Sequence, residues 1–102
     1  MEKKYYIKIA EELNISTEQV INTAALLDSG ATVPFIARYR KELTGSLDEI
    51  AITDIRDRMK QLIELDKRRD AIIKSIEEQG LMTDQIRAQL MEAITQTELE
   101  DI

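Results

Sequence analysis

The stretch ATVPFIARYRKELTG, residues 31–45, decides how the chain divides into helices. It holds the only proline and the only phenylalanine of the protein, Pro34 and Phe35. Thr32 can cap a short helix with Pro34 in its first turn, where proline costs no hydrogen bond because those N–H groups lack helical partners. The stretch therefore predicts a short third helix. The residues expected on its apolar, core-facing side are Phe35, Ile36 and Tyr39.

Two helices are expected before this stretch. The first covers residues 4–13 and is interrupted at Asn14. The second begins at Ser16 and Gln19, a capping box in which each side chain bonds the backbone N–H of the other residue. Gly30 supplies the left-handed conformation that commonly ends a helix. The inward-facing residues expected are Ile7, Ala10 and either Leu13 or Ile9, and then Val20, Ala24 and Leu27 flanked by Ile21 and Ala25.

A long helix is expected after the stretch. Ser46 and Glu49 form another capping box, and no proline or glycine follows before Gly80. At 1.5 Å per residue the helix would span roughly 45 to 50 Å unless it kinks near residues 52–53. Its middle, residues 66–70, is too polar for a continuous coiled-coil seam. The apolar positions expected to face inward are Ile52, Ile55, Met59, Leu62, Leu65, Ile72 and Ile76.

The C-terminal residues predict two further helix starts. Thr83 can cap a helix with Ile86, Leu90 and Ile94 inward, and Thr97 with Glu100 forms a last capping box. Because so few residues follow that box, we expect the chain to be a fragment of a larger protein. Leu99 and Ile102 are then expected to lack packing within the domain itself.

The fold class predicted is all-α, because helical spacing and caps recur while extended alternation is absent. A chain of 102 residues corresponds to one small domain, residues 1–102. We expect a small multi-helix bundle with one long helix. The second and third helices, joined through a turn at Gly30, resemble a helix-turn-helix with the third helix in the recognition position.

Composition limits the function classes. The chain has no cysteine and no histidine, which removes thiolate chemistry, cysteine-ligated zinc and the commonest general base. It has neither a signal peptide pattern nor an apolar run of roughly 20 residues, so a cytoplasmic protein is expected, with no membrane partner. The net charge of −6 opposes nucleic-acid binding, yet residues 77–102 hold seven acids against one cation. The preceding residues are neutral in sum.

The candidate nucleic-acid-binding residues are Arg38, Tyr39, Arg40 and Lys41. The three cations can contact phosphates, and the tyrosine ring can stack on a base or a sugar. The alternative is structural: a core position for Tyr39 would prevent stacking and leave the arginines as salt-bridge or interdomain partners.

Other charged residues favour structural interpretations. Lys67, Arg68 and Arg69 form the densest basic cluster, but acids at helical spacing predict a charge-compensated, solvated face. The carboxylates of Asp54, Asp57, Asp66 and Asp70 share helical faces, yet cations interleave with them. We therefore expect no metal site, no catalytic residue and no cofactor. ATP binding has no support either, because the three glycines are far apart and each can be explained by a turn or cap.

The core VPFIARYRKE, residues 33–42, followed by Thr44 and Gly45, resembles the signature of the Tex family of bacterial transcription accessory proteins, which bind nucleic acid. The segments SIEEQG at 75–80 and TELED at 97–101 resemble later parts of the same N-terminal region. The resemblance implies a larger protein with a ribonuclease-H-like domain, a helix-hairpin-helix part and an S1-type RNA-binding domain, none of which lies in these residues.

Together these features predict a non-catalytic N-terminal domain of a Tex-like transcription accessory protein. It would act as a scaffold with auxiliary RNA or DNA binding, and its partners would be other domains of the same protein and the transcription machinery. The alternative is a protein-protein or interdomain module that never contacts nucleic acid, which the acidic composition favours.

Overall fold

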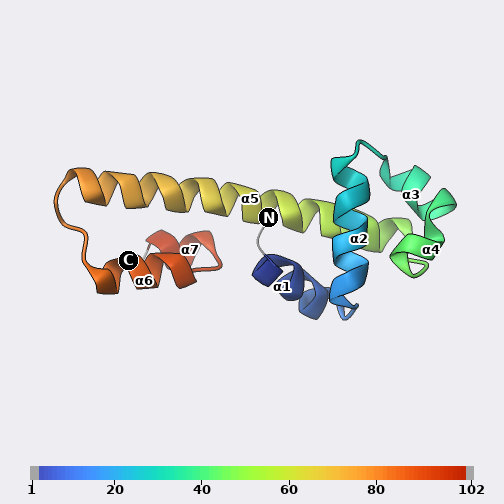
Figure 1. Cartoon of the computed structure of the whole chain (residues 1–102), viewed down its shortest axis with the longest axis horizontal. Helices are drawn as coiled ribbons and strands as arrows, with labels where there is room; N and C mark the ends of the chain where they lie inside the picture. The colour runs from blue at the N-terminus through green and yellow to red at the C-terminus, as the bar shows by residue number, and fades with distance from the viewer. Residues whose placement is uncertain (1–2, 101–102) are drawn as a thin grey trace. The chain divides into compact units, whose positions relative to one another are not determined.

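A computed structural model describes residues 3–100 of the chain, and every regular element among them is a helix. The all-α prediction is thus confirmed for the described residues. The helices are α1 (Lys3–Leu13), α2 (Thr17–Asp28), α3 (Val33–Tyr39), α4 (Lys41–Thr44), α5 (Glu49–Glu78), α6 (Asp84–Glu92) and α7 (Gln96–Glu100), labelled in Figure 1. None of these helices is both long enough and apolar enough to cross a membrane.

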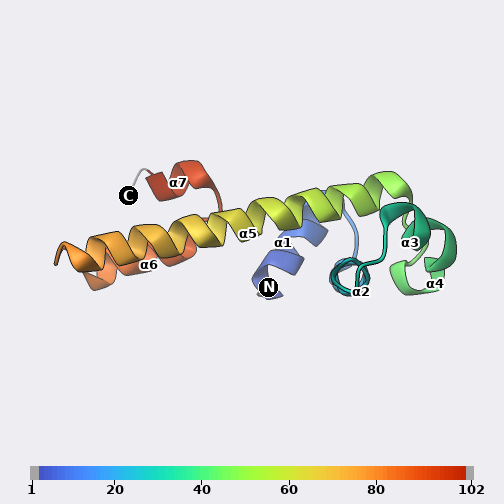
Figure 2. The same ribbon diagram turned by 90° about the horizontal axis from the view of Figure 1, so that it is seen from above.

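The chain divides into two compact units, Met1–Lys60 and Gln61–Ile102. In the N-terminal unit α2 packs against α1, α3 and α4. It crosses the first part of α5, and α3 and α4 lie near the start of that helix (Figures 1 and 2). The buried residues of this unit include Tyr5, Ile9, Ala10, Val20, Ala24, Ile36, Ile52 and Ile55. Ile7, expected inside, is 40% exposed.

The predicted caps of the first helices are confirmed. Asn14 has a left-handed φ of 56°, which ends α1. The N–H of Gln19 donates to Ser16 Oγ at 3.1 Å, and the N–H of Ser16 donates to Gln19 Oε1 at 2.9 Å. Gly30, which has a φ of 96°, lies just after the end of α2. Residues 31–32 then lead into α3. A recognition role for α3 stays a prediction.

Gln19 has a second role that its capping box did not indicate. Its Nε2 donates to the carbonyl oxygen of Thr44 at 3.0 Å, at the end of α4. Asn22 Nδ2 donates to the carbonyl oxygen of Leu43 at 2.9 Å. Two side chains of α2 thereby satisfy terminal carbonyls of α4 that no helical N–H can reach. This bonding fixes α4, and the break before it, on the surface of α2.

The predicted capping box of Ser46 and Glu49 is wrong. Ser46 has a φ of 65° and donates its N–H to the carbonyl oxygen of Lys41 at 2.9 Å, so it belongs to the end of α4. The cap of α5 is Asp48, whose Oδ1 accepts from the N–H of Ala51 at 2.8 Å. From there α5 runs through 30 residues as one helix, without a break at residues 52–53. Figure 2 shows it as one continuous ribbon.

The C-terminal unit is built from the second part of α5 with α6 and α7. Its buried apolar residues are Leu62, Leu65, Leu90, Ala93 and Leu99. Gly80 (φ 71°) follows α5, and Thr83 caps α6 as predicted, accepting from the N–H of Ile86 at 3.1 Å. Ile72, Ile76, Ile86 and Ile94 are only half-buried.

The predicted box of Thr97 and Glu100 is also wrong. Thr95 Oγ1 accepts from the N–H of Glu98 at 3.1 Å, and the Glu98 carboxylate accepts from the N–H of Ile94 at 2.9 Å. Leu99 is 1% exposed rather than unpacked. Its expected companion Ile102 lies outside the described residues.

Candidate nucleic-acid interface

The helix break at Arg40 positions the predicted site residues. Thr32 Oγ1 accepts from the N–H of Phe35 at 3.3 Å and starts α3. Arg40 has φ −129° and ψ 33°, which ends α3 and starts α4. Arg38 and Tyr39 therefore lie in the last turn of α3, while Lys41 is the first residue of α4.

Two aromatic rings and two guanidinium groups come together at this break. The ring centroids of Phe35 and Tyr39 are 5.4 Å apart with an interplanar angle of 48°. Arg40 Cζ lies 4.9 Å from the centroid of Phe35, and Arg38 Cζ lies 5.9 Å from that of Tyr39. Both distances are within the range of a cation–π interaction. We call Phe35, Arg38, Tyr39 and Arg40 the aromatic-cation cluster.

The cluster is on the surface, which corrects the expected core position of its rings. Phe35 is 39% exposed and Tyr39 57% exposed, whereas Ile36 is fully buried. Val33 and Ile36, three residues apart, supply the buried stripe of α3. Phe35 and Tyr39, four residues apart, form a second stripe beside it. Because Val33 and Ile36 form the buried face of α3, the tyrosine ring on the other stripe stays accessible for stacking.

The cations of this region carry no ion pair to any carboxylate among residues 3–100. Within residues 3–100, the only side-chain hydrogen bond of these three cations runs from Arg40 Nη1 to the carbonyl oxygen of Tyr39, at 2.9 Å. By contrast, Arg58 pairs with Glu12 at 2.8 Å across the N-terminal unit. Arg38, Arg40 and Lys41 thus keep their charges available to an external anion.

An open pocket of about 400 Å³ adjoins the cluster. It is lined by Pro34, Phe35, Arg38, Tyr39 and Glu49. The last of these is the first residue of α5, so two helices of the N-terminal unit form the pocket. Lys41 is exposed but does not line it. The sequence pattern did not indicate Phe35 and Glu49 as site residues, because it placed Phe35 in the core and Glu49 in a capping box.

The basic run at residues 67–69 is only partly a solvated face. Lys67 pairs with Glu64 at 3.4 Å, and both side chains are about 70% exposed. Arg69, however, is 4% exposed. Its Nε donates to the carbonyl oxygen of Leu90 at 2.7 Å, and its other nitrogens bond Asp66 and the carbonyl oxygen of Ala93.

The spacing of α5 contained a signal for the burial of Arg69. The buried positions Leu62 and Leu65 are followed at steps of four and three by Arg69 and Ile72. An arginine in an apolar register can place its stem in the core and its guanidinium on buried carbonyls. Here that guanidinium satisfies the end of α6.

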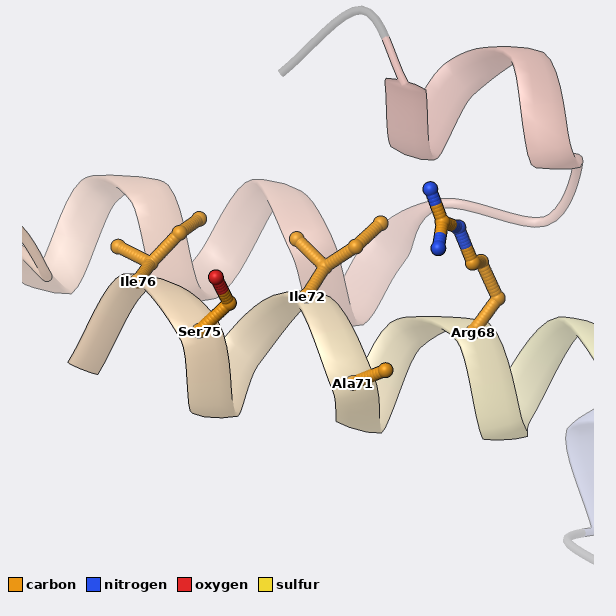
Figure 3. Close-up of a pocket in the computed structure, with 5 residues that line it drawn as sticks. All are labelled: Arg68, Ala71, Ile72, Ser75 and Ile76. Carbon is orange, nitrogen blue, oxygen red and sulfur yellow. The ribbon is translucent and has the colours of Figure 1, made fainter. Parts of the chain in front are cut away.

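A second, smaller pocket of about 190 Å³ lies on this part of α5 (Figure 3). Arg68, Ile72 and Ile76 follow one another along it at four-residue steps, with Ala71 and Ser75 completing its lining. Its polar groups are the guanidinium of Arg68 and the hydroxyl of Ser75, and all of its lining residues belong to α5.

Two of the four aspartates at helical spacing on α5 are in ion pairs with other described residues. Asp57 pairs with Arg56 at 3.2 Å, and Asp66 pairs with the buried Arg69. Within residues 3–100, no three acidic side chains are arranged to hold a metal ion.

Comparison with known proteins agrees with the resemblance seen in the sequence. The model of the family described as Tex-like protein N-terminal domain matches residues 3–77. The chain is 48% identical to the transcriptional accessory protein Tex of Neisseria gonorrhoeae and 49% identical to protein YhgF of Escherichia coli (strain K12). Both comparisons cover 94 residues, which is 92% of this chain. The S1 RNA-binding domain-containing protein 1 of Homo sapiens is 29% identical over the same share.

The chain spans only a small part of these relatives, 12% of the length of the two bacterial proteins and 9% of the human one. The matched part nevertheless includes both the signature at residues 33–42 and most of α5. The chain belongs to the Tex-like protein N-terminal domain family.

Proposed function

We propose that this chain acts in the cytoplasm as a non-catalytic scaffold in transcription, and that its α3–α4 surface makes auxiliary contacts with RNA or DNA. The observation that carries the proposal is the aromatic-cation cluster: two exposed rings beside guanidinium groups that no carboxylate among residues 3–100 neutralises. A role in transcription and nucleic-acid contact is supported by the names of two relatives, a transcriptional accessory protein and an S1 RNA-binding domain-containing protein.

The chemistry of the cluster suits a nucleic-acid backbone and its bases. Arginine binds phosphate oxygens in a planar, bidentate geometry. An accessible ring such as Tyr39 can stack on a base, an interaction worth about 1–3 kcal/mol per base. Lys41, exposed at the start of α4, would add a further phosphate contact.

The acidic net charge does not oppose this proposal at the site itself. Residues 1–76 carry as many cations as acids, and the excess of acids lies in residues 77–102. Residues 31–45 carry three cations against one acid, Glu42, and exposed charges act mainly within about 10 Å at 0.1 M salt. A non-catalytic role is supported by the absence of histidine and cysteine from the sequence.

A second candidate is a protein-protein or interdomain module. It is favoured by apolar side chains exposed in the same unit, of which Ile50 is 73% exposed and Leu43 44% exposed. In that case Phe35 and Tyr39 would pack against another domain of a longer protein or against the transcription machinery. The arginines would then pair with acids of the partner.

Fluorescence anisotropy separates the two candidates. The chain is titrated against fluorescein-labelled single-stranded RNA and against duplex DNA, at low and at physiological salt. Arg38→Ala combined with Arg40→Ala is compared with Lys60→Ala combined with Lys74→Ala, which removes the same charge from exposed positions of α5.

Binding that weakens with salt is expected, and the arginine variant should flatten the salt slope for a single strand by about 1.4, because each phosphate contact contributes about 0.7. The lysine variant should bind like the unmodified chain. Absence of binding at low salt, or equal losses in both variants, would refute the nucleic-acid contact and favour the module.

A further inference from the structure

We infer that the pocket beside the aromatic-cation cluster takes an unpaired guanine base of a single strand, with Glu49 accepting hydrogen bonds from the edge of that base. This inference rests on the proposed function. It adds a base preference that the cations and rings alone would not give.

The rings favour a single strand over a duplex. Phe35 and Tyr39 are tilted by 48° with centroids 5.4 Å apart, so their faces do not form one flat platform. A base that stacks on the exposed face of Tyr39 must leave its own neighbours, and bases in a duplex are already stacked on both sides. The pocket has a volume of about 400 Å³, at the lower end of the range of roughly 300–1,000 Å³ found for small-molecule sites.

The charges within the pocket orient the nucleotide. Arg38 and Glu49 both line it, and Glu49 has no ion pair within the described part of the chain. A carboxylate repels phosphate, whereas a guanidinium attracts it. The sugar-phosphate backbone should therefore follow the arginines, and the base should approach Glu49.

A carboxylate selects a base edge with adjacent donors. It accepts hydrogen bonds and donates none, and its two oxygens can accept two parallel N–H bonds. Guanine presents such a pair, N1–H and the 2-amino group. Adenine and cytosine place an acceptor nitrogen beside their amino group, and uracil places its single N–H between two carbonyl oxygens, so each of these would bring a lone pair toward the carboxylate.

Glu49 is positioned on a regular element rather than on a loop. It is the first residue of α5, directly after the cap Asp48, whose carboxylate accepts from the N–H of Ala51 at 2.8 Å. The backbone beneath Glu49 is therefore defined by the start of a 30-residue helix. For Glu49, binding of a base therefore needs to order the side-chain torsions but not the backbone.

The test compares nine-nucleotide uridine strands that differ at the central base. The central residue is guanosine, inosine, adenosine or uridine, where inosine lacks only the 2-amino group of guanosine. Anisotropy at low salt is measured for the unmodified chain, for Glu49→Gln and for the control Glu18→Gln. Glu18 is also an exposed acid in the first turn of a helix, α2, but it does not line the pocket.

The guanosine strand should bind the unmodified chain and Glu18→Gln at least about fivefold more tightly than the other three strands, the lower bound for a bidentate base contact. Glu49→Gln should reduce that preference to less than about twofold and should bind the all-uridine strand more tightly, because a carboxylate that repels phosphate is gone. The corresponding deoxyribonucleotide strands should show the same preference, since the base edge does not involve the 2′-hydroxyl.

The failures are distinguishable. If every strand binds with equal affinity and the Arg38→Ala, Arg40→Ala variant loses that binding, the guanine inference is wrong while the proposed function stands. A preference that survives in Glu49→Gln, or one confined to ribonucleotides, would also overturn it. If no strand binds at low salt, both proposals fail.

Discussion

Replacing Arg69 with methionine should destabilise the C-terminal unit selectively. The Arg69 side chain is 4% exposed and donates to the carbonyl oxygens of Leu90 and Ala93, where α6 ends. Methionine keeps much of the apolar stem but leaves these two acceptors without their charged donor. Each hydrogen bond to a charged group contributes about 1.5–3 kcal/mol, so the loss of two should cost about 3–6 kcal/mol.

Asp66 should contribute little to this loss. Its side chain is 40% exposed, so water can hydrate the carboxylate once the guanidinium is removed. The magnitude therefore depends mainly on the two carbonyl groups. Arg69→Lys provides an intermediate variant, since an ammonium group retains the charge but not the planar set of donors that reaches both carbonyls.

Urea denaturation followed by circular dichroism gives the free energy of unfolding, and hydrogen exchange gives its location. Exchange should accelerate in α6 and α7 while the amides of α1 and α2 keep their protection. The matched control is Arg68→Met, which changes the neighbouring, exposed arginine. If Arg69→Met is within about 0.5 kcal/mol of Arg68→Met, the range of an ordinary surface substitution, the buried guanidinium does not hold α6.

Two further stability predictions are checked by the same urea titration. Gly45→Ala should destabilise the protein more than Gly80→Ala. Both glycines have a left-handed φ, which costs a residue with a Cβ about 1–2 kcal/mol. Only at Gly45 would the new Cβ also lie 2.6 Å from Gln19 Nε2. Equal costs would contradict that contact. Phe35→Ala should cost no more than about 1.5 kcal/mol and Ile36→Ala about 2–5 kcal/mol, because the first ring is exposed and the second side chain is buried. The reverse order would place Phe35 in the core.

The helix ends were predictable from the sequence wherever only one capping residue was available. Ser16 with Gln19, Thr32 and Thr83 all cap the helices expected of them, and Gly30 and Gly80 take the left-handed conformation. A cap acts over three residues and a glycine acts at its own position. Distant parts of the chain are not needed to choose these conformations, and the family signature is equally local.

The wrong caps were predicted where two nearby residues could each cap the same helix. Ser46 and Asp48 could each cap α5, and Ser46 instead closes α4 through its N–H. Thr95 and Thr97 could each start α7, and the structure uses Thr95. In both places the sequence pattern fits either residue, and the preceding segment decides which is free to act as a cap.

The candidate site was predictable in residue type but not in arrangement. The sequence alone singled out Arg38, Tyr39, Arg40 and Lys41, because it places three cations and an aromatic ring within four residues, although the same residues also fitted a structural role. The helical spacing wrongly placed Tyr39 on the core-facing side, and nothing in the sequence indicated that Glu49 lies in the same pocket as that ring.

The sequence by itself determined the all-α fold, the family, the extent of most helices and the identity of the cationic residues, because these depend on interactions within a few positions of the chain. Only the tertiary structure decided that Ile36 enters the core while Tyr39 stays outside, and that Arg69 is buried at the end of α6. The physical reason is that a helix fixes which residues share a face, whereas the face that is buried depends on the apolar surface and the unpaired carbonyls that other helices present to it.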